Sequence, residues 1–228
     1  ANNLQKLLIS KNFTNESRYF SDWVLRRTST NYNNISDIII KTTLDPKVQS
    51  EVEKAVSLIL KKRTDLEAAV IVLDINGAVK GMLGGRSFYK SQFNRATQSL
   101  RQPGSVFKLF TYLAALELGM GAYDNIEDMP LDLDGWSPNN YNKKYKGLIS
   151  LKEAFSISSN VAAIRLQEIS GRDNVIKWAK KLGVSSHLKP ERSLSLGTQS
   201  ISLIEMTNAY AAIASGGITP FIHGVETI

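Results

Sequence analysis

The apolar run from Val106 to Leu118 constrains this chain more than any other segment. Apolar residues fill nearly every position of the run, which predicts a helix over Ser105–Leu118 that is buried on most of its surface. Lys108 stands in the first turn, although a lysine normally takes the face of a helix that water reaches. Gly119 and Gly121 follow the run, where such a helix ends. The segment therefore predicts a buried helix whose single amine lacks a polar face to lie on.

A serine stands three residues before that lysine, and two interpretations of the pair are open. Ser105 follows Gly104, which leaves room for a substrate, and it lies where the free N–H groups and dipole of a helix favour an oxyanion. Burial lowers the pKa of a lysine by up to about 3–5 units, so Lys108 could accept the hydroxyl proton near neutral pH. In the other interpretation, Ser105 caps the helix and Lys108 extends along it to the surface.

The Ser-x-x-Lys spacing is weak evidence by itself, because the chain contains it three times. The other two copies are Ser87/Lys90 and Ser186/Lys189. Neither copy has an apolar helix behind it, and this difference favours the pair at Ser105.

A second polar group, Ser158 and Asn160, interrupts the apolar pattern of a helix expected around Leu151–Ile169. Such side chains either point into a cleft or cap a helix.

The remaining pattern places strands first, helices in the middle and more strand near the C-terminus. The expected elements are a strand over Asp37–Leu44, a helix that begins at Asp45-Pro46 and turns Val48, Val52, Ala55, Val56, Ile59 and Leu60 inward, a hairpin around Asn76-Gly77, an irregular loop over Met129–Gly147, a helix over Asp173–Leu182, and a last helix that opens with the capping box Ser202-x-x-Glu205 and ends at Gly216-Gly217. This order predicts an α/β fold of the α+β type, in which helices flank an antiparallel sheet.

Composition excludes several kinds of site. The 228 residues carry a net charge of +7, but the basic residues are dispersed, so a solvated basic surface is favoured over nucleic-acid binding. The chain has no cysteine and only His187 and His223, which leaves little material for a Cys-type zinc site or a Ser-His-Asp triad. No cofactor and no metal are expected.

The start of the chain indicates that it is part of a longer protein, because its first residue is Ala1. Residues 1–36 are polar and rich in asparagine, apart from the aromatic stretch RYFSDWVL. We expect these residues to be a linker or docking segment, followed by one domain over residues 37–228. No apolar run is long enough to span a bilayer.

Short motifs along the chain resemble one known family. Ser105-Val106-Phe107-Lys108 and Ser158-Ser159-Asn160 are similar to the first two motifs of the penicillin-binding serine acyltransferases. The surrounding segments resemble the transpeptidase domain of the bifunctional, class A penicillin-binding proteins. In chain order these segments are TTLD (Thr42–Asp45), MLGG (Met82–Gly85), FNRAT (Phe93–Thr97), RQPGSVFK, DGWSPNNY (Asp134–Tyr141) and Leu196-Gly197. The agreement in order over most of the chain is more specific than any single motif.

The resemblance implies a D,D-transpeptidase that cross-links peptidoglycan stem peptides and is a target of β-lactams. In this family's chemistry Ser105 would be the nucleophile, Lys108 the base, Ser158 a proton relay and Asn160 a partner of the substrate backbone. The resemblance also implies an upstream glycosyltransferase domain and a membrane anchor, and a location on the outer face of the bacterial inner membrane, in the periplasm.

One family motif is absent, and two other functions remain as alternatives. Neither Lys-Thr-Gly nor Lys-Ser-Gly occurs, so we expect the strand that bears this third motif to follow Ile228, and we expect the chain alone to be impaired. A β-lactamase would use Glu191 for deacylation, but Ser195 stands where its Glu-x-x-x-Asn pattern requires asparagine. A sensing or scaffolding domain would be acylated without turnover.

Overall fold

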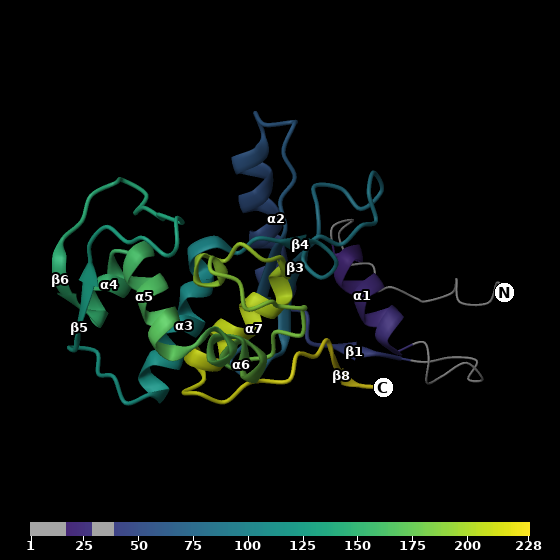
Figure 1. Cartoon of the computed structure of the whole chain (residues 1–228). Coiled ribbons are helices and arrows are strands. Elements are labelled where there is room, and N and C mark those ends of the chain that lie inside the picture. The colour runs from purple at the N-terminus through teal and green to yellow at the C-terminus, as the bar shows by residue number, and fades with distance from the viewer. Residues whose placement is uncertain (1–16, 29–38) are drawn as a thin grey trace. The chain divides into compact units, whose positions relative to one another are not determined.

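The computed structural model describes residues 17–28 and 39–228. These residues form two compact units, of which the second contains Leu100–Ile201 and the first contains the described residues on either side of it. Figure 1 shows the order of the elements along the chain. The first unit contains α1 (Arg18–Thr28), β1 (Lys41–Thr42), α2 (Pro46–Leu60), β2 (Val70–Leu73), β3 (Val79–Leu83), α7 (Leu203–Ala214) and β8 (Val225–Thr227).

In the first unit, local signals place the elements where the sequence predicts them. Asp45 accepts hydrogen bonds from two backbone N–H groups at the start of α2, with Pro46 in the first turn. β2 and β3 pair antiparallel, and Gly77 in the turn between them has a φ of +89°, which glycine adopts without strain. Ser202 and Glu205 form the predicted capping box of α7.

Two expectations for this unit need correction. Of the strand expected over Asp37–Leu44, only β1 forms, and it pairs with β8. Residues 37 and 38 of the expected strand lie outside the described part. In α2, Ala55 is exposed and Ile59 is 73% exposed, so the predicted inner face is only partly buried. Figure 1 shows the C-terminal half of α2 extending beyond the strands, which leaves these residues in solvent.

The segment expected as a linker or docking segment contains a packed helix. The residues of α1 that face inward are fully or nearly fully buried: Tyr19, Phe20, Trp23 and Val24. Phe20, Trp23 and Val24 belong to a core cluster with Val79 and Met82 of β3. This part of the segment therefore packs onto the first unit, and residues 1–16 and 29–36 lie outside the described residues.

The second unit is mainly helical and holds all four predicted site residues. Its elements are β4 (Leu100–Arg101), the 3₁₀ turn η2 (Gly104–Phe107), α3 (Lys108–Glu117), β5 (Asn125–Asp128), β6 (Gly147–Ser150), α4 (Leu151–Ser156), α5 (Asn160–Ser170), α6 (Arg172–Lys181) and the 3₁₀ turn η3 (Leu194–Leu196), with β7 (Ile201–Ser202) at the boundary. α3, α5 and α6 pack on one another. One core cluster joins α3, α4 and α5 to the β5–β6 pair, so the helix expected from Ser105 is buried as predicted, but it begins at Lys108, after the 3₁₀ turn η2.

The described strands form separate two-stranded pairs and not one continuous sheet. The pairs β1–β8, β2–β3 and β5–β6 are all antiparallel. A single bridge between Ala78 and His223 connects the hairpin to the segment that precedes β8. The α+β class with antiparallel strands is confirmed, in this subdivided form.

Candidate active site

Lys108 is the first residue of α3, and 1% of it is exposed. Its Nζ donates hydrogen bonds to the backbone O of Ser158 at 2.6 Å, to Ser158 Oγ at 3.0 Å and to Asn160 Oδ1 at 2.6 Å. Three of the four residues predicted from the sequence are therefore joined by direct hydrogen bonds. The interpretation in which Lys108 extends to the surface is wrong.

A break in the predicted helix brings Ser158 and Asn160 to this amine. The apolar pattern of residues 151–169 predicts one helix, but α4 ends at Ser156 and α5 begins at Asn160. Ser158 has a φ of +56°, in the left-handed region that residues other than glycine rarely occupy. This conformation directs both the carbonyl and the hydroxyl of Ser158 at Lys108, and such strain is typical of functional sites.

Ser105 lies in η2, one turn before Lys108, and its surface is exposed. In the described residues its hydroxyl makes no hydrogen bond to Lys108 Nζ, whose three donors go to Ser158 and Asn160. Gly104 has a φ of +60°, and a Cβ there would meet nothing within 4 Å. The backbone before Ser105 is therefore open to a ligand, as the sequence predicts.

The other two Ser-x-x-Lys copies differ from this one in burial. Lys90 and Lys189 are both exposed, whereas Lys108 is buried. Glu191, the residue that a β-lactamase would use, is also exposed. Ser195, four residues later, has no exposed surface. Burial thus distinguishes one of the three copies as a candidate base.

A buried carboxylate supports the segment that carries Ser158 and Asn160. Asp128 at the end of β5 is 1% exposed and accepts hydrogen bonds from Ser159 Oγ, Asn140 Nδ2 and the backbone N–H of Lys146, at 2.7, 2.7 and 2.8 Å. Burial raises the pKa of Asp128, but these three donors outweigh it and hold the pKa below its ordinary value of 3.8. Asp128 is therefore an anion that fixes Ser159, the N-cap of α5.

The loop between β5 and β6 holds Asn160 directly. Asn140 Oδ1 accepts the backbone N–H of Asn160 at 2.8 Å, and Asn160 Nδ2 donates to the backbone O of Asn139 at 2.9 Å. The amide of Asn160 is thus oriented with its oxygen toward Lys108. Asp128, Asn139 and Asn140 were not predicted as supporting residues, although the motif DGWSPNNY contains the two asparagines.

Burial lowers the pKa of Lys108 from 10.5 to about 8. At pH 7 roughly one lysine in ten is then neutral, compared with fewer than about one in a thousand at the ordinary pKa. In the neutral amine one donor is replaced by a lone pair. The hydroxyl of Ser158 can turn and donate to that lone pair, because a hydroxyl both donates and accepts. The cluster can therefore exist with Lys108 charged or neutral.

Two kinds of feature are absent from the described residues. Between residues 17 and 28 and from 39 onward, no three His, Cys, Asp or Glu side chains are grouped so that they could hold a metal ion. In the same residues no helix combines the length and the apolar character that crossing a membrane requires.

Comparison with known proteins identifies the family. The family model described as the penicillin binding protein transpeptidase domain matches residues 68–228. The chain belongs to this family. The match includes all four predicted site residues, and it agrees with the resemblance seen in the sequence motifs.

Individual relatives of this transpeptidase-family chain are longer than the chain itself. Penicillin-binding protein 1A of Neisseria meningitidis is 36% identical over 172 residues, which cover 72% of the chain and 22% of that protein. Penicillin-binding protein 2D of Bacillus subtilis is 33% identical over 80% of the chain and 28% of its own length. The chain thus spans about a fifth to a quarter of the curated relatives it matches.

Solved structures of the family superpose on this chain. The PonA1 protein from Mycobacterium tuberculosis in complex with penicillin V matches with a TM-score of 0.83 and 28% identity, over 93% of this chain and 62% of that one. Penicillin-Binding Protein 1A from Haemophilus influenzae matches with a TM-score of 0.65 and 34% identity, over 70% of this chain and 25% of that one. The first of these proteins was solved with a β-lactam bound.

Proposed function

We propose that the chain is the acylating part of a serine D,D-transpeptidase that cross-links peptidoglycan stem peptides and is acylated by β-lactams. The observation that carries the proposal is the buried Lys108, which shares hydrogen bonds with Ser158 and Asn160 one turn after an exposed Ser105. A buried amine with a lowered pKa is a base matched to neutral pH. Membership of the transpeptidase family supports the same chemistry.

In the proposed acylation, neutral Lys108 takes the hydroxyl proton of Ser105 as the serine oxygen attacks the amide carbon of D-Ala-D-Ala. The backbone N–H of Ser105 stabilises the oxyanion of the tetrahedral intermediate. As the C–N bond breaks, the proton passes from Lys108 through the hydroxyl of Ser158 to the leaving amine of D-Ala. The product is an ester of Ser105, with Lys108 neutral again.

Deacylation is the same sequence with a different amine. The amine of a second stem peptide attacks the ester carbon and transfers its proton through Ser158 and Lys108 to the oxygen of Ser105. The side-chain amide of Asn160 lies beside this path and can bond to the backbone of the stem peptide. No metal or cofactor enters either step.

The third family motif would supply the rest of the site. Neither Lys-Thr-Gly nor Lys-Ser-Gly occurs in the chain. In the proposed enzyme this motif lies beyond Ile228 and provides the second oxyanion donor and a cation for the substrate carboxylate. We further propose that an upstream glycosyltransferase domain and a membrane anchor hold the domain on the periplasmic face of the inner membrane, and that residues 37–228 belong to the transpeptidase domain.

Reaction with benzylpenicillin tests this function. We expect the chain continued past Ile228 to gain one adduct by intact-mass spectrometry, and peptide mapping to place it on Ser105. Loss of one oxyanion donor typically slows such a reaction by about 10²–10³, so the chain that ends at Ile228 should react slowly or not at all. Ser105→Ala should abolish the adduct, while Ser87→Ala, at a matched Ser-x-x-Lys, should keep it.

The same experiment separates the alternatives. An adduct on Ser87 or Ser186, or one that survives Ser105→Ala, would contradict the assignment of the nucleophile. An adduct that neither hydrolyses nor is released by an added amine would support a sensing or scaffolding domain. Rapid hydrolysis that depends on Glu191 would support a β-lactamase.

A further inference from the structure

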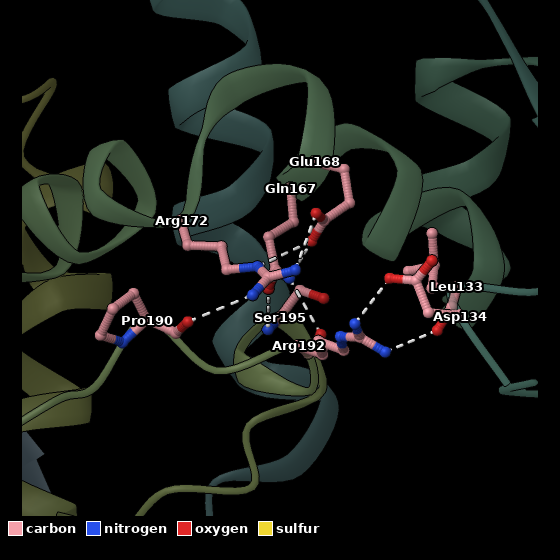
Figure 2. A network of polar contacts seen from close by, with 8 residues as sticks. All are labelled: Leu133, Asp134, Gln167, Glu168, Arg172, Pro190, Arg192 and Ser195. Carbon is pink, nitrogen blue, oxygen red and sulfur yellow. Dashed lines mark hydrogen bonds and ion pairs between the residues drawn. The ribbon is translucent and has the colours of Figure 1, made fainter. Parts of the chain in front are cut away.

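Gln167 is a fully buried polar residue in the middle of α5. Its Oε1 accepts the backbone N–H of Ser195 at 2.7 Å, and its Nε2 donates to the backbone O of Arg192 at 2.9 Å. Figure 2 shows the side chain pointing from α5 toward Ser195, on the segment that contains η3. Since a buried amide is costly unless it is hydrogen-bonded, both ends of Gln167 favour one position of η3.

The position of η3 determines that of the backbone just before Ser105. Gly197 follows η3 and accepts the backbone N–H of Gly104 at 3.1 Å. Gly197 has a φ of +66°, and a Cβ there would lie 2.1 Å from the carbonyl oxygen of Gly104. No side chain at Gly197 fits against Gly104, and this close approach together with the hydrogen bond couples the position of η3 to that of Gly104, the residue before Ser105.

Other contacts of this segment lie nearer the surface. Arg192 donates to the backbone O of Leu133 and to the carboxylate of Asp134, at 2.6 and 2.7 Å (Figure 2). Arg172, which is paired with Glu168 of α5, donates to the backbone O of Pro190 at 3.4 Å (Figure 2). Exposed ion pairs contribute little, because water screens them. Gln167 is thus a fully buried polar side chain that bonds this segment to α5.

α5 therefore contacts residues on both sides of Ser105, Lys108 directly and Gly104 through η3. Asn160 at its first position bonds to Lys108, and Gln167 bonds to η3. The two residues are seven positions apart, close to two full turns, so they lie on one face of the helix. A single rigid helix sets the place of the proposed base and, through η3 and Gly104, the place of the Ser105 backbone.

We propose that Gln167 is a positioning residue for acylation, which holds the Ser105 backbone N–H at the correct place relative to the Lys108 amine. The inference rests on the proposed function, and it adds a residue that does not touch the substrate. Gln167 acts through Ser195, Arg192 and the Gly197–Gly104 contact. Its loss should slow the formation of the ester while leaving the first, noncovalent binding of a β-lactam nearly unchanged.

The chain offers a matched control in Gln49. This second buried glutamine, in the first unit, accepts the backbone N–H of Met82 at 2.9 Å and donates to the backbone O of the same residue at 3.2 Å. Each glutamine also donates to a neighbouring glutamate, Gln49 to Glu53 at 2.8 Å and Gln167 to Glu168 at 3.0 Å. Gln167→Met and Gln49→Met therefore remove the same kinds of hydrogen bond, one accepted from a backbone N–H, one donated to a backbone O and one donated to a glutamate. The side-chain volume changes little in either variant, and both should lower the melting temperature.

Two measurements separate positioning from stability. In the chain continued past Ile228, benzylpenicillin acylation should be about 10- to 100-fold slower in Gln167→Met, with the noncovalent dissociation constant within about twofold of the parent, because small misplacement of reacting groups is costly. Gln49→Met should keep the parent acylation rate constant. In the chain as it stands, hydrogen exchange at the Gly104 amide should be faster in Gln167→Met than in Gln49→Met.

A third variant gives a pH signature. In Gln167→Glu the ionised side chain can accept from Ser195 but cannot donate to Arg192 or to the carboxylate of Glu168, which it would also repel, whereas the protonated side chain can accept from Ser195 and donate to one of these oxygens. The ratio of the variant to the parent acylation rate constant should therefore rise as the pH falls, and the same ratio for Gln167→Met should stay flat. Taking the ratio cancels the titration of Lys108, which both proteins share.

The outcomes distinguish this inference from the proposed function. An unchanged acylation rate constant in Gln167→Met, or equal Gly104 exchange in the two methionine variants, would overturn the positioning role. If the parent protein forms no adduct, the proposed function fails, and accelerated Gly104 exchange in Gln167→Met alone would then support only the structural part of the inference.

Discussion

Replacing Lys108 with methionine should change how the stability of the chain depends on pH. In the folded protein burial lowers the pKa of this lysine to about 8, whereas in the unfolded chain the pKa returns to the ordinary value of 10.5. Between these two values the unfolded state binds more protons than the folded state. The free energy of unfolding of the parent therefore rises with pH across this window.

The two pKa values set the size of the effect. Integrating the difference in bound protons from pH 7 to pH 9.5 gives a gain of about 2 kcal/mol for the parent from this one group. Lys108→Met has no such group, so its free energy of unfolding should rise by about 2 kcal/mol less over the same range. Its absolute stability reflects two further effects, the loss of a buried charge and the loss of donors for Ser158 and Asn160.

Urea unfolding at intervals of pH measures this difference. The matched control is Lys90→Met, which removes an exposed lysine from another Ser-x-x-Lys and should follow the parent curve. Other titrating groups cancel when each variant is compared with the parent. Parallel pH curves for Lys108→Met and Lys90→Met would refute the claim that Lys108 is a buried amine with a lowered pKa.

Three further substitutions test the support of the site by urea unfolding. Asp128→Asn removes a buried anion with three donors and should lower the free energy of unfolding by about 2–4 kcal/mol at pH 7. Because the pKa of Asp128 is lowered in the folded state, this difference between parent and variant should shrink as the pH falls below 3.8. Gly197→Ala meets both a left-handed φ and the carbonyl of Gly104 and should cost about 2–4 kcal/mol, whereas Gly147→Ala, with a φ of +80° and open space, should cost about 1–2. Ser195→Ala removes a buried hydroxyl that has no partner among the described residues, so stability should stay within about 0.5 kcal/mol or increase. A loss above about 1 kcal/mol in Ser195→Ala would show that its hydroxyl is bonded.

Features that depend on neighbours in the sequence could be predicted from the sequence. The N-cap at Asp45, the turn at Gly77 and the capping box of Ser202 and Glu205 each involve residues only two to four positions apart. The buried helix that begins at Lys108 was also predictable, because a run without a polar face has nowhere to lie but in a core. These signals depend on neighbouring residues, and the structure contains the caps, the turn and the helix that they predict.

Features that depend on distant residues could not be predicted. The apolar pattern favours one helix over residues 151–169, and local preference gives no reason for Ser158 to adopt a positive φ. The break is stabilised from the β5–β6 pair, where Asp128 and Asn140 bond to Ser159 and Asn160. Gln167 shows the same limit, since its two backbone partners lie more than twenty residues along the chain.

The candidate active site combines two features that are unfavourable by themselves, a buried amine at Lys108 and a left-handed backbone at Ser158. Each would be lost if the other moved, because the carbonyl that Ser158 turns inward is an acceptor for the amine. Helices packed together hold both features in place: α3 carries Lys108, and α5, buried along most of its length, begins two residues after Ser158. Spacing in the sequence cannot express this dependence, and so the chain contains three Ser-x-x-Lys copies, of which only the one with a buried lysine forms the cluster. The same dependence makes α5 the element through which Gln167, seven positions after Asn160, can affect the reaction of Ser105.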